Sequence, residues 1–166
     1  MTGFTFSLQP GRQATVGQPI RVQTANYLLR SITAADVTPE FVTWFNDPTM
    51  LLGLNIQALN FSMDGLRSFA ASFDNHHNFL IGVFDLKEQK LRGFFNFGVN
   101  HVHRICTLTF GMEPNSALAR PILHETIGPL FDEMFDKAGF DKITARVLLT
   151  NRRVLFSLMD NDHFVI

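Results

Sequence analysis

The sequence predicts an α/β (α+β) fold in which helices cover a mixed β-sheet. The first observation is the order of patterns from residue 27 onward: strand, two helices, three strands, helix, strand, helix. A strand–helix–strand crossover that follows an antiparallel meander adds a parallel strand to the sheet. The second is size: 166 residues with 46% hydrophobic and 17% charged residues suit one domain with a substantial core.

The chain divides into an N-terminal extension, residues 1–26, and a domain, residues 27–166. The extension holds two strand-like runs, "FTFSLQ" and "PIRVQT", so we expect it to form strands and to pack on the domain. "YLLRSI", residues 27–32, is the first strand expected in the domain itself.

Two helices are expected next. Thr38, Pro39 and Glu40 give an N-cap, a first helical position and an early acid. Asp47, which precedes a proline, ends this helix. Ser62 caps the second helix, in which apolar residues recur at helical spacing through residue 73.

Three strand-like runs then cover residues 78–85, 90–100 and 104–112, joined by short turns. This spacing is typical of an antiparallel meander. The second run carries Phe94, Phe95 and Phe97, which are either core residues or, on one face, a wall of the substrate site.

The last run continues into "EPNSALARP" and a helical pattern that opens at Pro121. Gly128 and Pro129 interrupt that pattern and predict a kink or a split. Gly139 fits the C′ cap, "KITARVLL" is a further strand, and "RRVLFSLMD" is a last helix.

Composition indicates which kinds of partner and which cellular compartment to expect. A net charge of −1 without a run of Lys and Arg argues against a nucleic-acid partner. No apolar run approaches 18 residues, so we expect no membrane span, and the N-terminus does not resemble a signal peptide. The single Cys106 favours a reducing compartment, so the cytoplasm is the expected location.

These patterns resemble the GCN5-related N-acetyltransferase (GNAT) family, and most the branch that acts on ribosomal-protein N-termini and on sugar or antibiotic amines. The resemblance covers residues 27–166. It is carried by "LRSITAADVTPEFVTWFNDP", the meander, the strand–loop–helix of residues 108–135, and "AGFDKITARVLLTN" with the short helix after it. It implies a mostly antiparallel central sheet with helices on both faces, and acetyl (acyl) transfer from acetyl-CoA directly to a primary amine.

The resemblance also implies which residues hold the cosubstrate. The strands at 105–112 and 143–149 would splay apart, which leaves backbone groups free for the pantetheine arm. The loop 113–120 and the following helix N-terminus would take the pyrophosphate. An α/β binding domain unrelated to acyl-CoA predicts no such splay. The cofactor-binding residues implied are Phe110, Gly111, Met112, Leu118, Ala119, Arg120, Ile122 and Asn151. No metal is expected.

Departures from the family pattern lie in this same region. Ala119, Pro121 and Leu123 stand near the usual loop glycines, and Pro121 removes one N–H donor. Leu158 replaces the general-acid tyrosine of many relatives, which leaves Ser157 beside it as the candidate proton donor. These changes keep open a catalytically weak or inactive binding or scaffold protein.

The given sequence stops at Ile166, where relatives add another hairpin, so we expect the family's C-terminal hairpin to be missing. We therefore expect residues 4–8 and 19–24 to pair with the sheet edge left free. An unpaired edge also makes a homodimer plausible.

Several side chains have two interpretations. His103, near a predicted hairpin turn with His101, is a candidate base or an exposed turn residue. His76 and His77 lack a third metal ligand at a convincing spacing. Asn151 either contacts the ligand or caps a helix, and the loop 113–120 is either a pyrophosphate site or a plain connection.

Overall fold

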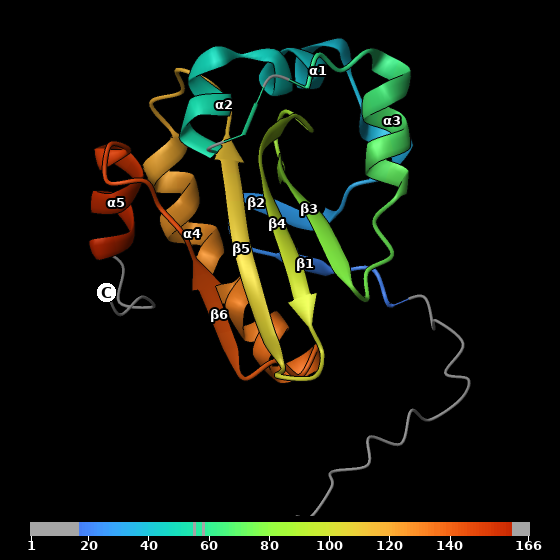
Figure 1. Cartoon of the computed structure of the whole chain (residues 1–166), viewed down its shortest axis with the longest axis vertical. Helices are drawn as coiled ribbons and strands as arrows, with labels where there is room; N and C mark the ends of the chain where they lie inside the picture. Colours follow the sequence, from blue (N-terminus) through green and yellow to red (C-terminus); the bar gives the residue numbers. More distant parts are fainter. Residues whose placement is uncertain (1–16, 55, 58, 161–166) are drawn as a thin grey trace, which may run out of the picture.

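A computed structural model describes residues 17–54, 56, 57 and 59–160. Its six strands form one sheet in the order β1 to β6 (Figure 1). All neighbours pair antiparallel except β5 and β6, which are parallel. The predicted mixed, mostly antiparallel sheet is therefore confirmed. The strands are β1 Arg21–Gln23, β2 Tyr27–Ser31, β3 Asn78–Asp85, β4 Leu91–Asn100, β5 Ile105–Met112 and β6 Lys142–Ala145.

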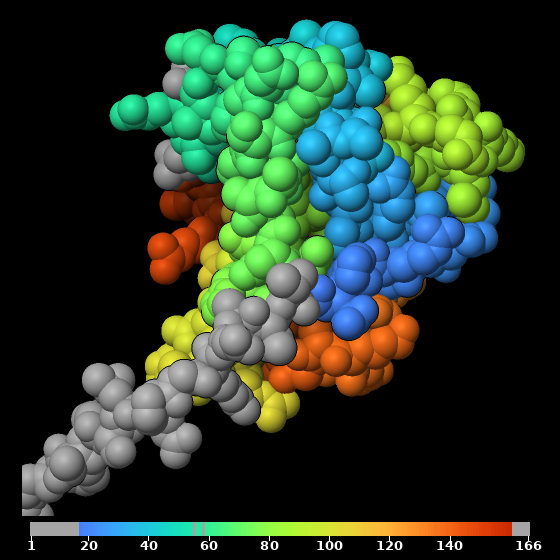
Figure 2. Space-filling model, turned by 90° about the vertical axis from the view of Figure 1, so that its right-hand side faces the viewer, coloured from blue at the N-terminus to red at the C-terminus, as the bar shows by residue number. Residues whose placement is uncertain are grey.

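Helices cover both faces of the sheet, as expected. A short 3-10 turn η1 (Ala34–Asp36), α1 (Pro39–Asn46) and α3 (Met63–Ala71) pack on one face, where Phe94 is buried among them. Helix α4 (Ala119–Asp132) covers the other face and buries Phe95 and Phe97. The three phenylalanines are at most 2% exposed, so the core interpretation is confirmed. Figure 2 shows α3, in green, packed along the light-blue segment that carries η1 and α1.

The predicted helix caps are confirmed, but one helix was missed. Thr38 and Ser62 accept backbone N–H bonds at the starts of α1 and α3. Asp47 does end α1, yet α2 (Pro48–Leu54) begins directly after it. The Asp47 carboxylate accepts the N–H of Met50 and so caps this second helix. The same residues thus stop one helix and start another.

Gly128 and Pro129, which predicted a kink or a split, do not split α4, and the kink stays a prediction. The helix continues to Asp132 and then widens into a π-turn η2 (Glu133–Lys137). Burial on both sides of Pro129, at Gly128 and Leu130, keeps the helix on the sheet despite the lost hydrogen bond. Gly139 has φ +75°, as expected of a left-handed cap. Within the described residues, none of the helices is long and apolar enough to span a membrane.

The N-terminal strand lies on the edge of the sheet opposite to the expected one. Strand β1 pairs with β2, whereas the edge without a partner strand in the described part of the chain is that of β6. The pairing predicted for residues 19–24 therefore exists but at the other edge, and residues 4–8 lie outside the described part. The division of the chain at residue 26 stays a prediction.

A single carboxylate fastens the β1–β2 turn to α4. Glu125 accepts hydrogen bonds from the Thr24 hydroxyl at 2.6 Å, the Asn26 N–H at 2.8 Å and the Asn26 amide at 2.9 Å. Because α4 begins beside the candidate site described next, this contact helps to fix the helix relative to the sheet.

Candidate functional site

Strands β5 and β6 separate after four residue pairs. The last pair is Leu108 with Ala145, and the remainder of β5 has no partner on that side among the described residues. Glu113 N–H donates to the Arg92 carbonyl of β4 at 2.8 Å. Since backbone groups alternate sides along a strand, those of Phe110 and Met112 face the gap. The predicted splay is present, and it leaves these groups without a strand partner.

Two adjoining cavities occupy this gap. The smaller, about 50 Å³, lies between the diverging strands, and the larger, about 180 Å³, lies beyond it toward the loop that precedes α4. Helix α2 covers both, at the C-terminal tip of β5 (Figure 1). The two cavities share Gly53, Leu54, Phe110 and Asn151 as lining residues.

The loop before α4 leaves two backbone donors available. Of the four N–H groups expected to serve a phosphate, that of Leu118 donates to the Ser116 hydroxyl, and that of Ile122 forms the first bond within the helix. Among the described residues, the N–H groups of Ala119 and Arg120 have no acceptor. Pro121 stands in the first turn, where proline is tolerated. The helix N-terminus thus offers two donors and its positive dipole end.

Arg146 lines the smaller cavity, and the cation of the larger one is Arg153, which the sequence did not single out. Its guanidinium donates to the Ser116 carbonyl at 3.0 Å, and it lines the larger cavity together with Ala119. Arg120, which was expected to help with the phosphate, instead pairs with Asp160 at 2.6 Å. Arg153 follows Asn151 on α5 (Arg152–Met159), and only the tertiary fold brings it to the loop.

Asn151 both caps a helix and borders the cavities. Its side-chain oxygen accepts the Val154 N–H, and its amide donates to the Gly53 carbonyl of α2, each at 3.3 Å. The second bond links α5 to α2 across the gap. A ligand that used the Asn151 amide would have to replace that bond.

Comparison with solved structures identifies the architecture. No protein-family model matches the sequence, and no curated protein matches it. The structure superposes on an acetyltransferase of the GNAT family from Bacillus anthracis with TM-score 0.69 at 13% identity, over 84% of this chain and 81% of that one. This chain has the GNAT fold.

Two further structures agree. The ribosomal-protein-S5-alanine acetyltransferase from Vibrio fischeri gives TM-score 0.67 at 16% identity, covering 86% of this chain and 82% of the other. The spermidine N-acetyltransferase from Vibrio cholerae, solved with CoA and spermine, gives 0.67 at 17%, covering 83% and 80%. At these identities the likeness establishes the GNAT fold.

Gly111 forms no β-bulge in β5. The β4–β5 register is unbroken there, with Phe94 opposite Gly111. The glycine is instead required by close packing, because a Cβ would lie 2.7 Å from the Phe94 ring and 2.9 Å from the Met50 sulfur. Its contribution to the site is to let α2 approach β5.

The candidate catalytic side chains do not meet in this GNAT fold. Among the described residues, neither Ser157 nor His103 lines either cavity. The Ser157 hydroxyl donates to the Arg153 carbonyl within α5. His103 lies in the exposed turn between β4 and β5, at the far end of β5 from Met112. The only tyrosine, Tyr27, is buried on β2, and two strands separate it from β5.

Two carboxylates that the sequence did not assign to the site line the larger cavity. Asp47 caps α2, and Glu113 follows β5. Glu113 forms ion pairs with Arg92 at 2.8 Å and with Lys90 at 3.6 Å. Much of the Glu113 charge is therefore compensated, whereas no cation is paired with Asp47 in the described part of the chain.

The one cysteine is unsuited to nucleophilic catalysis. Cys106 is fully buried in β5, and burial raises the pKa of its thiol to about 12. Because the thiolate is the nucleophilic form, this thiol is inert near neutral pH. An acyl-cysteine intermediate is thus disfavoured.

A larger groove, about 650 Å³, lies on the opposite side of α1, between η1 and the β3–β4 turn. Its charged residues pair with one another, Arg30 with Asp36 and Lys90 with Glu40. It also lies beside paired strands, which offer no free backbone groups to a ligand. The gap between β5 and β6 is the better candidate site.

Proposed function

We propose that the chain transfers an acetyl or other acyl group from acyl-CoA directly to a primary amine of a small molecule or a protein N-terminus. The observation that carries the proposal is the end of β5–β6 pairing at Leu108 and Ala145, with cavities in the gap. An extended thioester arm fits beside free strand groups, since it can pair with them as an added strand would.

Different residues suit different parts of the acyl-CoA cosubstrate. The backbone groups of Phe110 and Met112 suit the pantetheine arm and the thioester carbonyl. The N–H groups of Ala119 and Arg120, with the Arg153 guanidinium, suit the diphosphate. In the reaction the amine nitrogen forms the new C–N bond as the C–S bond breaks. The thiolate leaves, and one proton passes from the nitrogen to the sulfur through water.

An amine acceptor agrees with the charge of the cavity wall. The wall of the larger cavity carries the carboxylates of Asp47, which has no cationic partner in the described residues, and of the partly compensated Glu113, beside the cation Arg153. The Asp47 carboxylate can therefore pair with an ammonium group. The amine-acetylating neighbours, named for spermidine and for a ribosomal protein, support the same class of acceptor.

The gap can be tested by filling it. Thr109 and Thr107 are exposed threonines on the same face of β5, but only Thr109 lines the smaller cavity. We expect Thr109→Trp to abolish the thermal stabilisation of the protein by acetyl-CoA, and Thr107→Trp, beside the paired part of β6, to retain it. Equal stabilisation of both variants, or none of the wild type at millimolar acetyl-CoA, would refute the proposal.

A second candidate is a GNAT-fold binding or scaffold protein without efficient turnover. The position of Ser157 and Tyr27 outside the cavities favours it, because neither hydroxyl borders the space proposed for the thioester. Release of CoA thiol, followed across a panel of polyamines, amino sugars and peptides, separates the two. Stabilisation without thiol release from any amine would support the second candidate.

The cellular setting is part of the same proposal. A cytoplasmic location is supported by the buried, unpaired thiol of Cys106. A homodimer is supported by the outer edge of β6, which has no partner strand among the described residues. Sedimentation velocity would show a monomer if that edge does not pair.

A further inference from the structure

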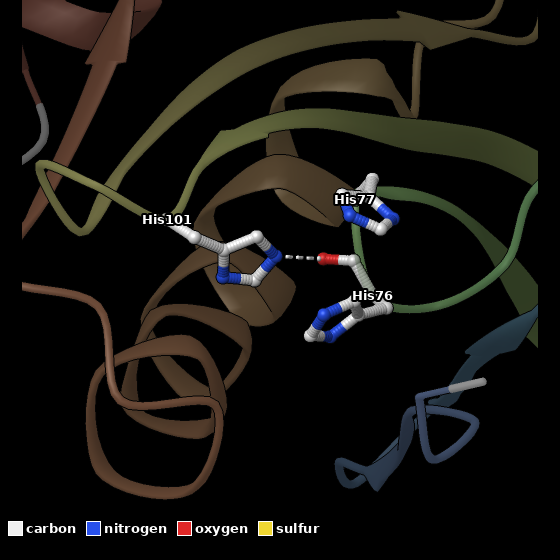
Figure 3. A group of neighbouring side chains, drawn as sticks. All are labelled: His76, His77 and His101. Atoms are coloured by element: carbon white, nitrogen blue, oxygen red, sulfur yellow. Dashed lines mark hydrogen bonds between the residues drawn. The ribbon is translucent and has the colours of Figure 1, made fainter. Parts of the chain in front are cut away.

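Three histidines meet at the end of the sheet away from the gap between β5 and β6, the proposed acyl-CoA site (Figure 3). His76 and His77 directly precede β3, and His101 directly follows β4. One ring nitrogen from each lies within 4.8 Å of the other two. The third ligand that no sequence spacing indicated for His76 and His77 is thus offered by His101, which lies beside them although it follows His77 by 24 positions in sequence.

The sheet register produces this meeting. Strands β3 and β4 pair antiparallel with Asn78 opposite Gly98, and the Val99 N–H donates to the His77 carbonyl at 2.9 Å. The start of one strand and the end of the next are thus held side by side. The ring centroids of His76 and His101 are 4.2 Å apart, and those of His76 and His77 are 4.6 Å apart.

Asp74 organises the histidine loop. One carboxylate oxygen accepts the N–H groups of His76, His77 and Asn78, and the other lies 2.7 Å from Nδ1 of His77. A carboxylate that is hydrogen-bonded to Nδ1 orients the ring and leaves Nε2 of His77 for a metal, the arrangement typical of metal-binding histidines.

We propose that His76, His77 and His101 bind one divalent transition-metal ion, for which Zn²⁺ is the best fit, with water in the remaining position. Imidazole is a preferred ligand of Zn²⁺, and three histidines with an open position form a known zinc geometry. With Zn–N bonds of about 2.0–2.1 Å, tetrahedral ligand atoms lie roughly 3.3 Å apart. The three rings must therefore close in from their present separation of up to 4.8 Å.

Closure is compatible with the surroundings of the rings. The His77 side chain is 55% exposed, and His101 lies in an exposed turn. His101 Nε2 now donates to the His76 carbonyl at 2.9 Å, so it must exchange this hydrogen bond for the metal or ligate through Nδ1. The bound ion would link the loop before β3 to the β4–β5 turn and so stabilise the folded state.

The test is a titration of the full-length chain, without a polyhistidine tag, with ZnSO₄ in competition with a chromophoric chelator. We expect one ion per chain and a higher Tm that EDTA reverses. His101→Gln and His77→Gln should each weaken binding by at least tenfold. His103→Gln is the matched control, because His103 lies in the same turn but outside the cluster, and should bind as the wild type does.

Asp74→Asn tests the orientation of His77 and should weaken binding about 10- to 100-fold. The visible spectrum of the Co²⁺ protein, intense for a tetrahedral site and weak for an octahedral aquo-ion, reports whether the rings have closed. A stoichiometry other than one, or an affinity unchanged in His101→Gln, would overturn the proposal. Because the cluster is remote from the gap, loss of zinc binding should leave acetyl-CoA stabilisation unchanged.

Discussion

Removal of the Glu125 carboxylate should measurably loosen α4 from the β1–β2 turn. Three hydrogen bonds end on this group, from Thr24 and from the backbone and side chain of Asn26. Hydrogen bonds to a charged group contribute about 1.5–3 kcal/mol each when buried. Two of these three hydrogen bonds are exposed to water, which competes for the same groups and so reduces their contribution to stability. We therefore expect Glu125→Ala to lower the free energy of unfolding by about 2 kcal/mol at pH 7.

The pH dependence of this loss has a definite sign. Burial alone would raise the pKa of Glu125, but the hydrogen bonds from Thr24 and Asn26 outweigh it, and the net shift is downward. A carboxylate with a lowered pKa in the folded state stabilises the fold above its unfolded pKa of about 4.3. That contribution disappears as the pH falls through the folded pKa. The difference between wild type and Glu125→Ala should accordingly shrink in acid.

The assay is urea-induced unfolding at pH 7 and again below pH 4, with His124→Ala as control. His124 is the exposed neighbour on α4, so its replacement changes helix propensity without touching the turn. If the free energy of unfolding of Glu125→Ala lies within about 0.5 kcal/mol of that of the control at pH 7, the three hydrogen bonds are no more stabilising than the hydrogen bonds to water that they replace. A difference that grows in acid would refute the sign of the pKa shift.

Three further outcomes are expected. Gly111→Ala should cost about 1–3 kcal/mol by overpacking, since the added Cβ meets Phe94 and Met50 below 3.0 Å; thermal unfolding measures it. Arg153→Ala should raise the Kd for acetyl-CoA about tenfold by calorimetry, whereas Arg152→Ala, outside the cavities, should not. Cys106→Ala should retain the rate of acyl transfer, and mass spectrometry of the wild type should reveal no acyl-enzyme; a loss of transfer in a folded variant would contradict direct transfer.

Local signals explain which parts of the fold could be predicted. The caps at Thr38 and Ser62 depend only on residues within one turn, and the strands β3 to β5 show clear runs of apolar residues. Helix α2 was missed because Pro48 is read equally well as the end of one helix or as the start of another. Strand β6 was predicted too long, since the sequence of residues 146–149 is strand-like although no partner strand follows it there.

The gap between β5 and β6 was predicted more successfully than the side chains beside it. The gap and the start of α4 follow from chain order, which the sequence displays. Arg153, Asp47 and the His101 partnership each depend on contacts between segments far apart in the chain. Such contacts leave no periodic signal in a single sequence. Ser157 and His103 were chosen for chemistry alone, and the fold places both outside the cavities.

Strand β5 connects the two proposed sites and also keeps them independent. Its last residues border the acyl-CoA gap, while the turn before it carries His101. The seven residue steps from Ile105 to Met112 span about 23 Å. No side chain lines both sites among the described residues. Perturbations so far apart without shared partners add in free energy. The stabilisation by zinc and acetyl-CoA together should therefore equal the sum of the separate effects, and a departure from that sum would reveal a coupling carried through β4 and β5.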